Sequence, residues 1–133
     1  MNPTEKIDAF LSGTSFAVAG ASTDRAKYGN RVLRAYLERK MPVTPIHPRE
    51  KEIEGIPTVR DVASLPEGVH GLSIVTPPLF TETVVDQAIS KGIRHLWMQP
   101  GAESEGAISR ATAAGCVVIH GGACVLVELP KRR

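Results

Sequence analysis

The segment Gly71–Pro78, with the sequence GLSIVTPP, decides the fold of this 133-residue chain. Its apolar and small residues follow one another without polar alternation, and two prolines end the run. This pattern is typical of a short strand that is buried on both faces of a parallel sheet. A helical pattern follows over residues 81–91, and Gly92 ends it. A buried strand that leads into a helix is the repeating unit of an α/β fold.

The same unit recurs on both sides of this segment. Further strands are expected over residues 15–19, 42–46, 95–99 and 116–119, and further helices over residues 4–12, 29–40 and 105–114. This order predicts an α/β protein with a three-layer, Rossmann-like, doubly wound fold. Its mostly parallel sheet has about five strands, with helices on both faces.

Length and composition indicate one domain over residues 1–133, with a basic tail at residues 129–133. Hydrophobic residues make up 42% and charged residues 23%, as in an ordinary globular domain. The net charge is +2, and Lys131, Arg132 and Arg133 contribute three positive charges. The rest of the chain is near neutral, which argues against a nucleic-acid partner.

Two further features bear on the cellular setting. No stretch reaches the ~18 apolar residues of a membrane span, and the charged N-terminus does not resemble a signal peptide. Cys116 and Cys124 are the two cysteines, too few for a disulfide framework. We therefore expect a cytoplasmic protein without a membrane partner.

The loop after the first strand suits a phosphate group. Gly20 lets the backbone approach a ligand, Ser22 adds a hydroxyl donor, and the helix from residue 29 would point its N-terminal amides at an anion. The fingerprint G-x-G-x-x-G is absent, with Ala21 after the one glycine. The loop alone is therefore equally compatible with a plain strand-to-helix turn.

The segment after the second strand is basic. NAD enzymes usually place Asp or Glu there for the ribose diol, whereas this chain has His47, Arg49 and Lys51. Positive groups suit a ribose that carries a phosphate, as in NADP and coenzyme A (CoA). A solvated surface loop is the alternative. Pro77 and Pro78, after the third strand, form a stiff apolar ledge for adenine or pantetheine, or a rigid start to a helix.

Several short motifs together resemble the small stand-alone CoA-binding proteins, a family similar to the CoA-binding domain of the succinyl-CoA synthetase alpha subunit. The resemblance runs from about Ile7 to Glu128 and rests on Ala17–Ser22, Lys27–Asn30, Val43–Pro48, Ile74–Pro78, Trp97–Gly101 and Cys124. Two features depart from that family. His47 stands where it commonly has Asn, and Gly122-Ala123 replaces an Asp-Arg pair before the cysteine.

The resemblance implies binding of CoA or an acyl-CoA and assigns a region of the ligand to each motif. The phosphates would lie at Gly20, Ala21 and Ser22, with Lys27 and Tyr28 nearby. The adenosine 3′-phosphate region would be bordered by Pro45, His47, Pro48 and Arg49, and the adenine or pantetheine would be flanked by Val75, Thr76, Pro77 and Pro78. Gln99 and Gly101 would lie toward the thiol end.

Chemistry beyond binding is weakly signalled. The four histidines lack metal-ligand spacing, and we assign no catalytic or metal-binding residue. Cys124 is interpreted either as a small packing residue or as a neighbour of the CoA thiol. The leading hypothesis is a CoA-binding module without catalysis of its own. The alternatives are an NADP-binding reductase and a sensor that reports CoA levels to a protein partner.

Overall fold

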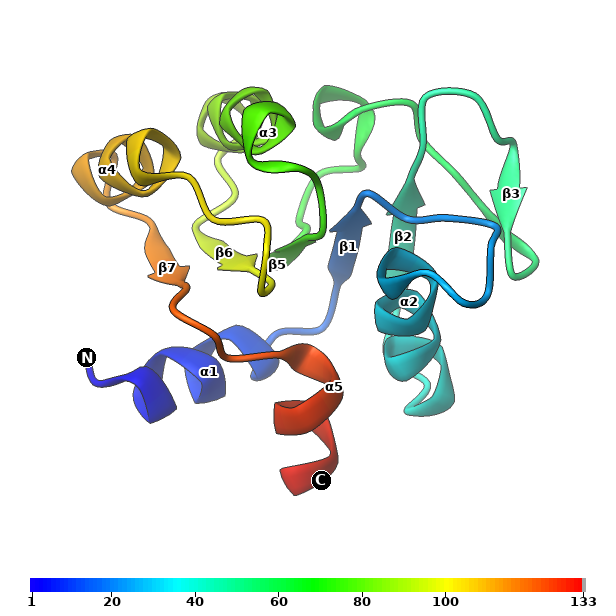
Figure 1. The fold of residues 1–133 in the computed structure, drawn as a ribbon, viewed down its shortest axis with the longest axis horizontal. Helices are drawn as coiled ribbons and strands as arrows, with labels where there is room; N and C mark the ends of the chain where they lie inside the picture. Colours follow the sequence, from blue (N-terminus) through cyan, green and yellow to red (C-terminus); the bar gives the residue numbers. More distant parts are fainter. Residues whose placement is uncertain (133) are drawn as a thin grey trace.

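The structure, a computed structural model, describes residues 1–132 and is built around a five-stranded sheet (Figure 1). The strands are β1 (Phe16–Ala19), β2 (Val43–Ile46), β5 (Gly71–Ile74), β6 (His95–Met98) and β7 (Val117–Ile119). They lie in the order β2-β1-β5-β6-β7, and every neighbouring pair is parallel. A separate antiparallel pair, β3 (Glu52–Ile53) and β4 (Ile56–Pro57), follows β2.

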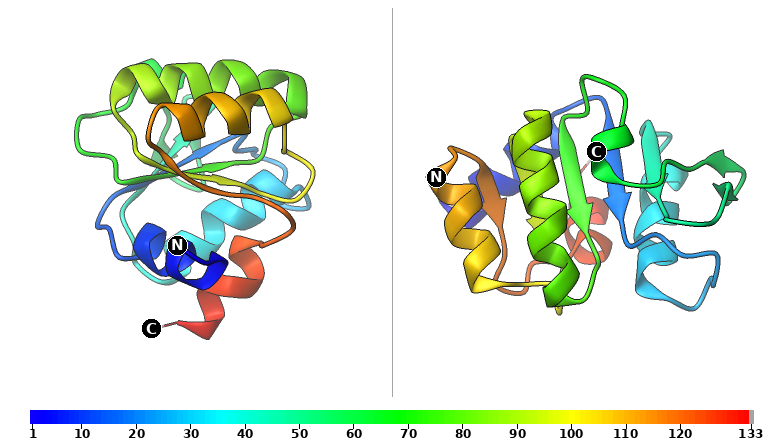
Figure 2. Two further views of the ribbon diagram at one scale, coloured as in Figure 1. Left: turned by 90° about the vertical axis from the view of Figure 1, so that its left-hand side faces the viewer. Right: turned by 90° about the horizontal axis from the view of Figure 1, so that it is seen from above.

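Helices cover both faces of the sheet (Figure 2). One face carries α1 (Pro3–Leu11), α2 (Tyr28–Glu38) and α5 (Val125–Glu128), and the other carries α3 (Pro78–Lys91), α4 (Glu105–Ala113) and the 3-10 turn η1 (Val62–Ser64). The predicted α/β, Rossmann-like fold is therefore confirmed. Among residues 1–132, no helix is long and apolar enough to cross a membrane.

The core side that faces α1 and α2 is aromatic. The Phe16 and Tyr36 rings stack with centroids 5.3 Å apart, and Phe10 meets Trp97 edge-on at 5.3 Å. The Tyr36 hydroxyl is 2.7 Å from the Ser73 hydroxyl, so both buried polar groups are satisfied. The opposite side of the sheet is aliphatic; there Leu72, Ile74 and Leu96 share a core cluster with Val85 of α3 and Ala107 of α4. The sheet is thus packed on both faces behind the carboxyl ends of its strands.

Three elements differ from the sequence-based expectations. Helix α3 begins at Pro78 and not at residue 81, because proline is well tolerated in the first turn of a helix. The hairpin β3–β4 and the short helix α5 were not predicted. The tail continues from α5 into a 3-10 turn (Leu129–Lys131), and Arg132 pairs with Asp8 and Glu128. Arg133 lies outside the described residues.

The sheet positions a site where its strand order reverses, between β1 and β5. Ala19, the last residue of β1, is in register with Ile46 of β2 and Ile74 of β5. The three strands therefore end level with one another, and the chain leaves them in different directions. In open parallel sheets this reversal point is where ligands bind.

Candidate functional site

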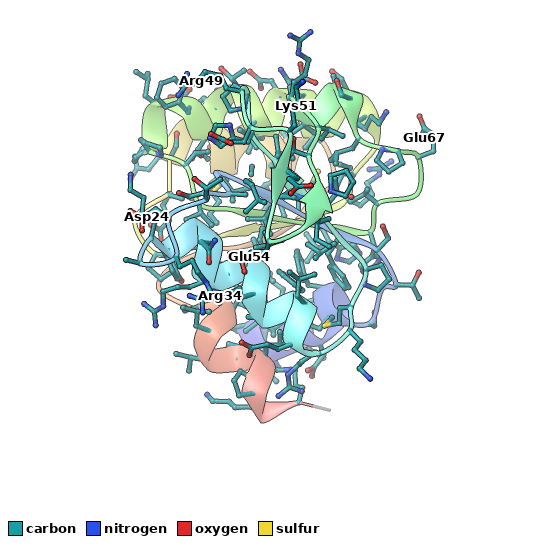
Figure 3. The ribbon with its side chains drawn as sticks, turned by 90° about the vertical axis from the view of Figure 1, so that its right-hand side faces the viewer. Asp24, Arg34, Arg49, Lys51, Glu54 and Glu67 are labelled. Atoms are coloured by element: carbon teal, nitrogen blue, oxygen red, sulfur yellow. The ribbon has the colours of Figure 1, made fainter. Side chains whose placement is uncertain are left out.

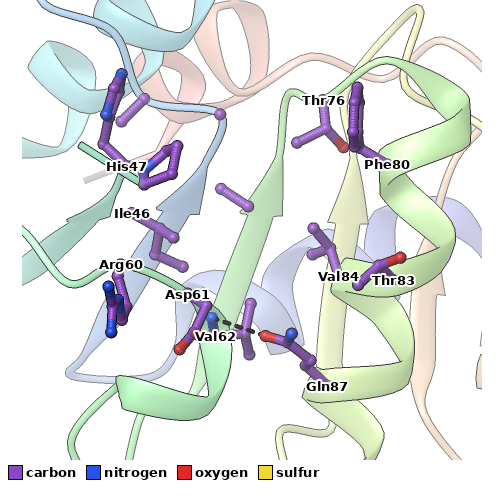
Figure 4. A pocket seen from close by; sticks show the side chains of 14 residues that line it. Ile46, His47, Arg60, Asp61, Val62, Thr76, Phe80, Thr83, Val84 and Gln87 are labelled. Atoms are coloured by element: carbon purple, nitrogen blue, oxygen red, sulfur yellow. Dashed lines mark hydrogen bonds between the residues drawn. The ribbon is translucent and has the colours of Figure 1, made fainter. Parts of the chain in front are cut away.

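A pocket of about 540 Å³ lies at the carboxyl ends of β2, β1 and β5, under the first turns of α3 (Figure 4). We call it the apolar pocket. Ile46, Val62, Phe80 and Val84 supply its apolar walls, and its polar groups are His47, Arg60, Asp61 and Gln87. Its volume is in the range of small-molecule sites. Phe80 is 61% exposed, so its ring offers uncovered apolar surface at the pocket.

A second pocket, of about 400 Å³, adjoins the first. We call it the polar pocket. It lies between the loop after β1 (Gly20–Ser22), the start of α2 (Lys27–Gly29) and the segment Val75–Pro77. Gly20, Ala21, His47 and Thr76 line both pockets, so the two form adjoining compartments of one crevice.

Two glycines allow the crevice to form. Gly20 has φ +87°, and a Cβ placed on it would lie 2.7 Å from the carbonyl oxygen of Val75. A Cβ on Gly29 would lie 2.0 Å from the carbonyl oxygen of Gly20. The end of β1 therefore packs directly on the backbone of both neighbouring segments, as only glycine permits.

The first turn of α2 faces the polar pocket. Helix α2 starts at Tyr28 after Lys27, whose side chain makes no capping hydrogen bond. The pocket is thus bordered by a helix N-terminus, with its partial positive charge, and by a lysine. The Asn30 side chain holds the loop in place, because its Nδ2 donates to the carbonyl oxygen of Ser22 at 2.8 Å and to Glu54 Oε2 at 3.1 Å.

Behind the polar pocket lies a hydrogen-bonded group of Tyr28, Gln99 and Cys124. The Tyr28 hydroxyl lies 3.1 Å from Gln99 Oε1 and 2.5 Å from Cys124 Sγ. Gln99 Oε1 also accepts from the Val125 amide at 2.9 Å. Burial raises the pKa of Tyr28 well above its usual range, and the contact with Cys124 raises it further. Gln99 is fully buried, and its Nε2 has no partner among the described residues.

His47 is held in one orientation by its own loop. Its Nδ1 accepts from the backbone amides of Arg49 at 3.0 Å and Glu50 at 2.9 Å. Because Nδ1 accepts, the ring proton of the neutral imidazole resides on Nε2. Arg49 and Lys51 themselves are exposed and line neither pocket; they lie at the outer edge of the molecule (Figure 3).

The structure brings most of the expected binding residues to this crevice. Its two pockets are lined by Gly20, Ala21, Ser22, Lys27, Tyr28, His47, Pro48, Val75, Thr76 and Pro77. The others lie outside both linings: Pro45 within β2, Arg49 in the exposed loop, Pro78 at the start of α3, Gln99 behind Tyr28, and Gly101 in the turn after β6.

Sequence reasoning missed the apolar residues on both walls of the apolar pocket, and it also missed Arg60 and Asp61. Arg60 and Asp61 follow the β3–β4 hairpin, and that hairpin returns the chain to the sheet. The return is fixed by a parallel bridge between Ile46 and Val59, where the His47 amide donates to the Val59 carbonyl oxygen at 2.9 Å. No local pattern signals this long-range contact.

Among residues 1–132, no group of three His, Cys, Asp or Glu side chains is placed to hold a metal ion.

Comparison with known proteins places the chain in a family. The model of the CoA binding domain matches residues 14–130, nearly the whole sequence. The chain belongs to the CoA-binding domain family. The resemblance that the motifs indicated is therefore confirmed.

Members of this family also occur within longer proteins. The alpha subunit of ADP-forming acetate–CoA ligase II from Pyrococcus furiosus is 30% identical over 89 residues, which are 66% of this chain and 20% of that protein. The chain thus spans about a fifth of the length of this relative. It is a CoA-binding domain related to subunits of acyl-CoA synthetases.

Solved structures give the same relationship. A conserved hypothetical protein from Pyrococcus furiosus is 38% identical with a TM-score of 0.82, covering 86% of this chain and 97% of that one. The dinucleotide-forming acetyl-coenzyme A synthetase 1 of Ca. Korarchaeum cryptofilum, in complex with phosphate and ADP, is 28% identical with a TM-score of 0.73. That match covers 80% of this chain and 25% of that one. The family therefore includes a small protein of similar length and a domain of a larger synthetase.

Proposed function

We propose that this chain binds CoA or an acyl-CoA in the crevice between the carboxyl ends of β1 and β5. The observation that carries the proposal is the junction of two unlike compartments at Gly20. One is apolar and of small-molecule size, and the other is polar and bordered by a helix N-terminus. The ADP part of CoA has the same two halves, a flat purine nucleoside and a pyrophosphate. Membership of the CoA-binding domain family supports the same ligand.

In this proposal the pyrophosphate occupies the polar pocket. The backbone of Gly20–Ser22, the Lys27 ammonium and the amides at the start of α2 supply positive charge and hydrogen-bond donors on three sides. Helix N-termini and glycine-containing loops bind phosphate groups in this way because their amide hydrogens are otherwise unpaired. Among residues 1–132, no carboxylate lines this pocket.

The adenosine occupies the apolar pocket. The purine ring lies between Ile46 and Val62 on one side and Phe80 and Val84 on the other, which Figure 4 shows as facing walls. The exposed ring of Phe80 loses water contact when the purine covers it, and burial of aromatic surface is favourable. The pantetheine arm then leaves past Tyr28, and the protein acts by binding, with no catalytic step of its own.

Native mass spectrometry with a defined ligand set tests this function. The purified protein is mixed with equimolar CoA, acetyl-CoA and NADP, each present in excess. We expect the adducts with the masses of CoA and acetyl-CoA to be more abundant than the NADP adduct. An NADP adduct as abundant as the CoA adduct would instead support the reductase alternative, and the absence of every adduct would overturn the proposal.

A further inference from the structure

Arg60 is a cation at the ligand crevice with no partner of its own. It lies between β4 and η1 and lines the apolar pocket on the wall that also holds His47 (Figure 4). Its guanidinium makes no ion pair or hydrogen bond with any of residues 1–132. Arg49 and Lys51, the cations that the sequence places next to the second strand, line neither pocket. Arg60 is therefore the one Lys or Arg side chain among the described residues that lines the apolar pocket.

His47 adds a neutral donor on the same wall. Its Nδ1 is occupied by the amides of Arg49 and Glu50, which leaves the Nε2–H as the ring's only donor. The imidazole lines both pockets, at the point where a nucleoside in one would join a pyrophosphate in the other. An asparagine in place of His47 can accept hydrogen bonds from the same two backbone amides through its short side chain. The asparagine has no donor at the position that the His47 Nε2–H occupies.

The carboxylate in the pocket is already engaged. Asp61 Oδ1 accepts from the Ser64 amide at 2.9 Å and from the Ser64 hydroxyl at 2.7 Å, and so caps η1. A carboxylate that accepts hydrogen bonds from the hydroxyls of an unphosphorylated ribose must turn its oxygens toward the ligand. Here one oxygen is held by η1, whereas the neighbouring guanidinium has all of its donors available.

We propose that Arg60, assisted by the Nε2–H of His47, binds the phosphate group on the adenosine ribose and so selects ligands that carry it. The inference rests on the proposed function, because it assigns a part of the same ligand. A guanidinium matches two phosphate oxygens at once, and such charge-assisted hydrogen bonds are stronger than neutral ones. A ligand without this phosphate leaves Arg60 in water and loses the interaction.

Calorimetric titration with CoA and dephospho-CoA tests the assignment. These ligands differ only in the ribose phosphate. Four proteins are compared: the unmodified chain, Arg60→Ala, His47→Asn and the matched control Arg49→Ala, which removes an exposed arginine from the same segment between β2 and η1. Because Arg60 and Arg49 are both exposed, neither alanine variant disturbs the core. Equal thermal midpoints for the four proteins confirm that they fold.

The unmodified chain is expected to bind CoA about 10- to 100-fold more tightly than dephospho-CoA. Arg60→Ala is expected to remove most of this ratio by weakening CoA alone, and His47→Asn to remove part of it. Arg49→Ala is expected to leave both affinities unchanged.

The inference is overturned if Arg60→Ala weakens both ligands equally or neither, if Arg49→Ala carries the loss, or if the unmodified chain binds the two ligands equally. In each of these cases CoA still binds, so the proposed function stands. If the unmodified chain binds neither ligand, the proposed function itself fails.

Discussion

Replacing Gly20 with alanine perturbs the crevice at its narrowest point. The residue has φ +87°, and the added Cβ would lie 2.7 Å from the Val75 carbonyl oxygen, several tenths of an ångström inside ordinary contact. The left-handed backbone costs an L-residue about 1–2 kcal/mol. Separation of two packed backbone segments costs about 1–3 kcal/mol more. We therefore expect Gly20→Ala to lower the free energy of unfolding by about 2–5 kcal/mol and to weaken CoA binding.

Gly92→Ala is the matched control for this substitution. Gly92 has φ +82°, but a Cβ there would meet no atom within 4 Å, and the residue ends α3 away from both pockets. It should cost only the backbone part, about 1–2 kcal/mol, and leave CoA affinity unchanged. Urea unfolding measures the two stabilities, and calorimetry measures binding. Equal losses in the two variants would refute the close approach of Gly20 to Val75.

The remaining predictions concern stability. Tyr36→Phe leaves the buried Ser73 hydroxyl unpaired and should cost about 1–3 kcal/mol in urea unfolding, part of which the double variant with Ser73→Ala recovers. Burial, and the stacked His70 ring 4.2 Å away, lower the pKa of His95. The unfolded chain therefore binds more protons than the folded chain as the pH falls below about 6.5. For this reason the free energy of unfolding should fall as the pH drops from about 6.5, until His95 titrates in the folded state. A flat profile of this free energy between pH 7 and 5 would contradict the prediction. Arg132→Ala removes the ion pairs that join the tail to α1 and α5 and should lower stability by less than about 1 kcal/mol in urea unfolding.

The sheet was predictable because its signals are local. Each core strand is a short apolar run that a glycine, a proline or a polar loop ends, and each helix has a periodic apolar face. The start of α3 was misplaced for a local reason as well. Pro77 and Pro78 were expected to form an apolar ledge or a rigid start to a helix, but the helix itself was placed from residue 81. The structure includes Pro78 in the first turn of α3. Helix α5 has only four residues, which is too short to show a helical period.

Within the candidate site, the sequence predicted only residues that follow the ends of strands. Gly20 and His47 stand directly after strand ends, and Thr76 follows β5 after one intervening residue, so the rule that ligands bind at the carboxyl edge was enough to find them. Arg60 and Phe80 reach the same crevice through tertiary packing. The position of Arg60 depends on the hairpin that brings the chain back to β2, and the position of Phe80 depends on where α3 begins. Neither arrangement is encoded in a short motif.

In the basic loop after β2, residues of similar type occupy different positions relative to the crevice. His47, Arg49 and Lys51 look alike as a positive cluster in the sequence, yet only the histidine lines the crevice. Its ring also supports the loop by accepting two backbone amides. The loop that the sequence indicated thus supplies one residue to the crevice, and the structure adds a cation, Arg60, from a segment more distant in the sequence.

A co-crystal with CoA would locate the ligand in electron density. We expect the pyrophosphate at Gly20–Ser22 beside the start of α2, and the purine between Ile46 and Phe80. We also expect the ribose phosphate within hydrogen-bond distance of Arg60. Density for CoA at any other face, or an adenosine in the crevice whose ribose hydroxyls are held by Asp61, would contradict this placement.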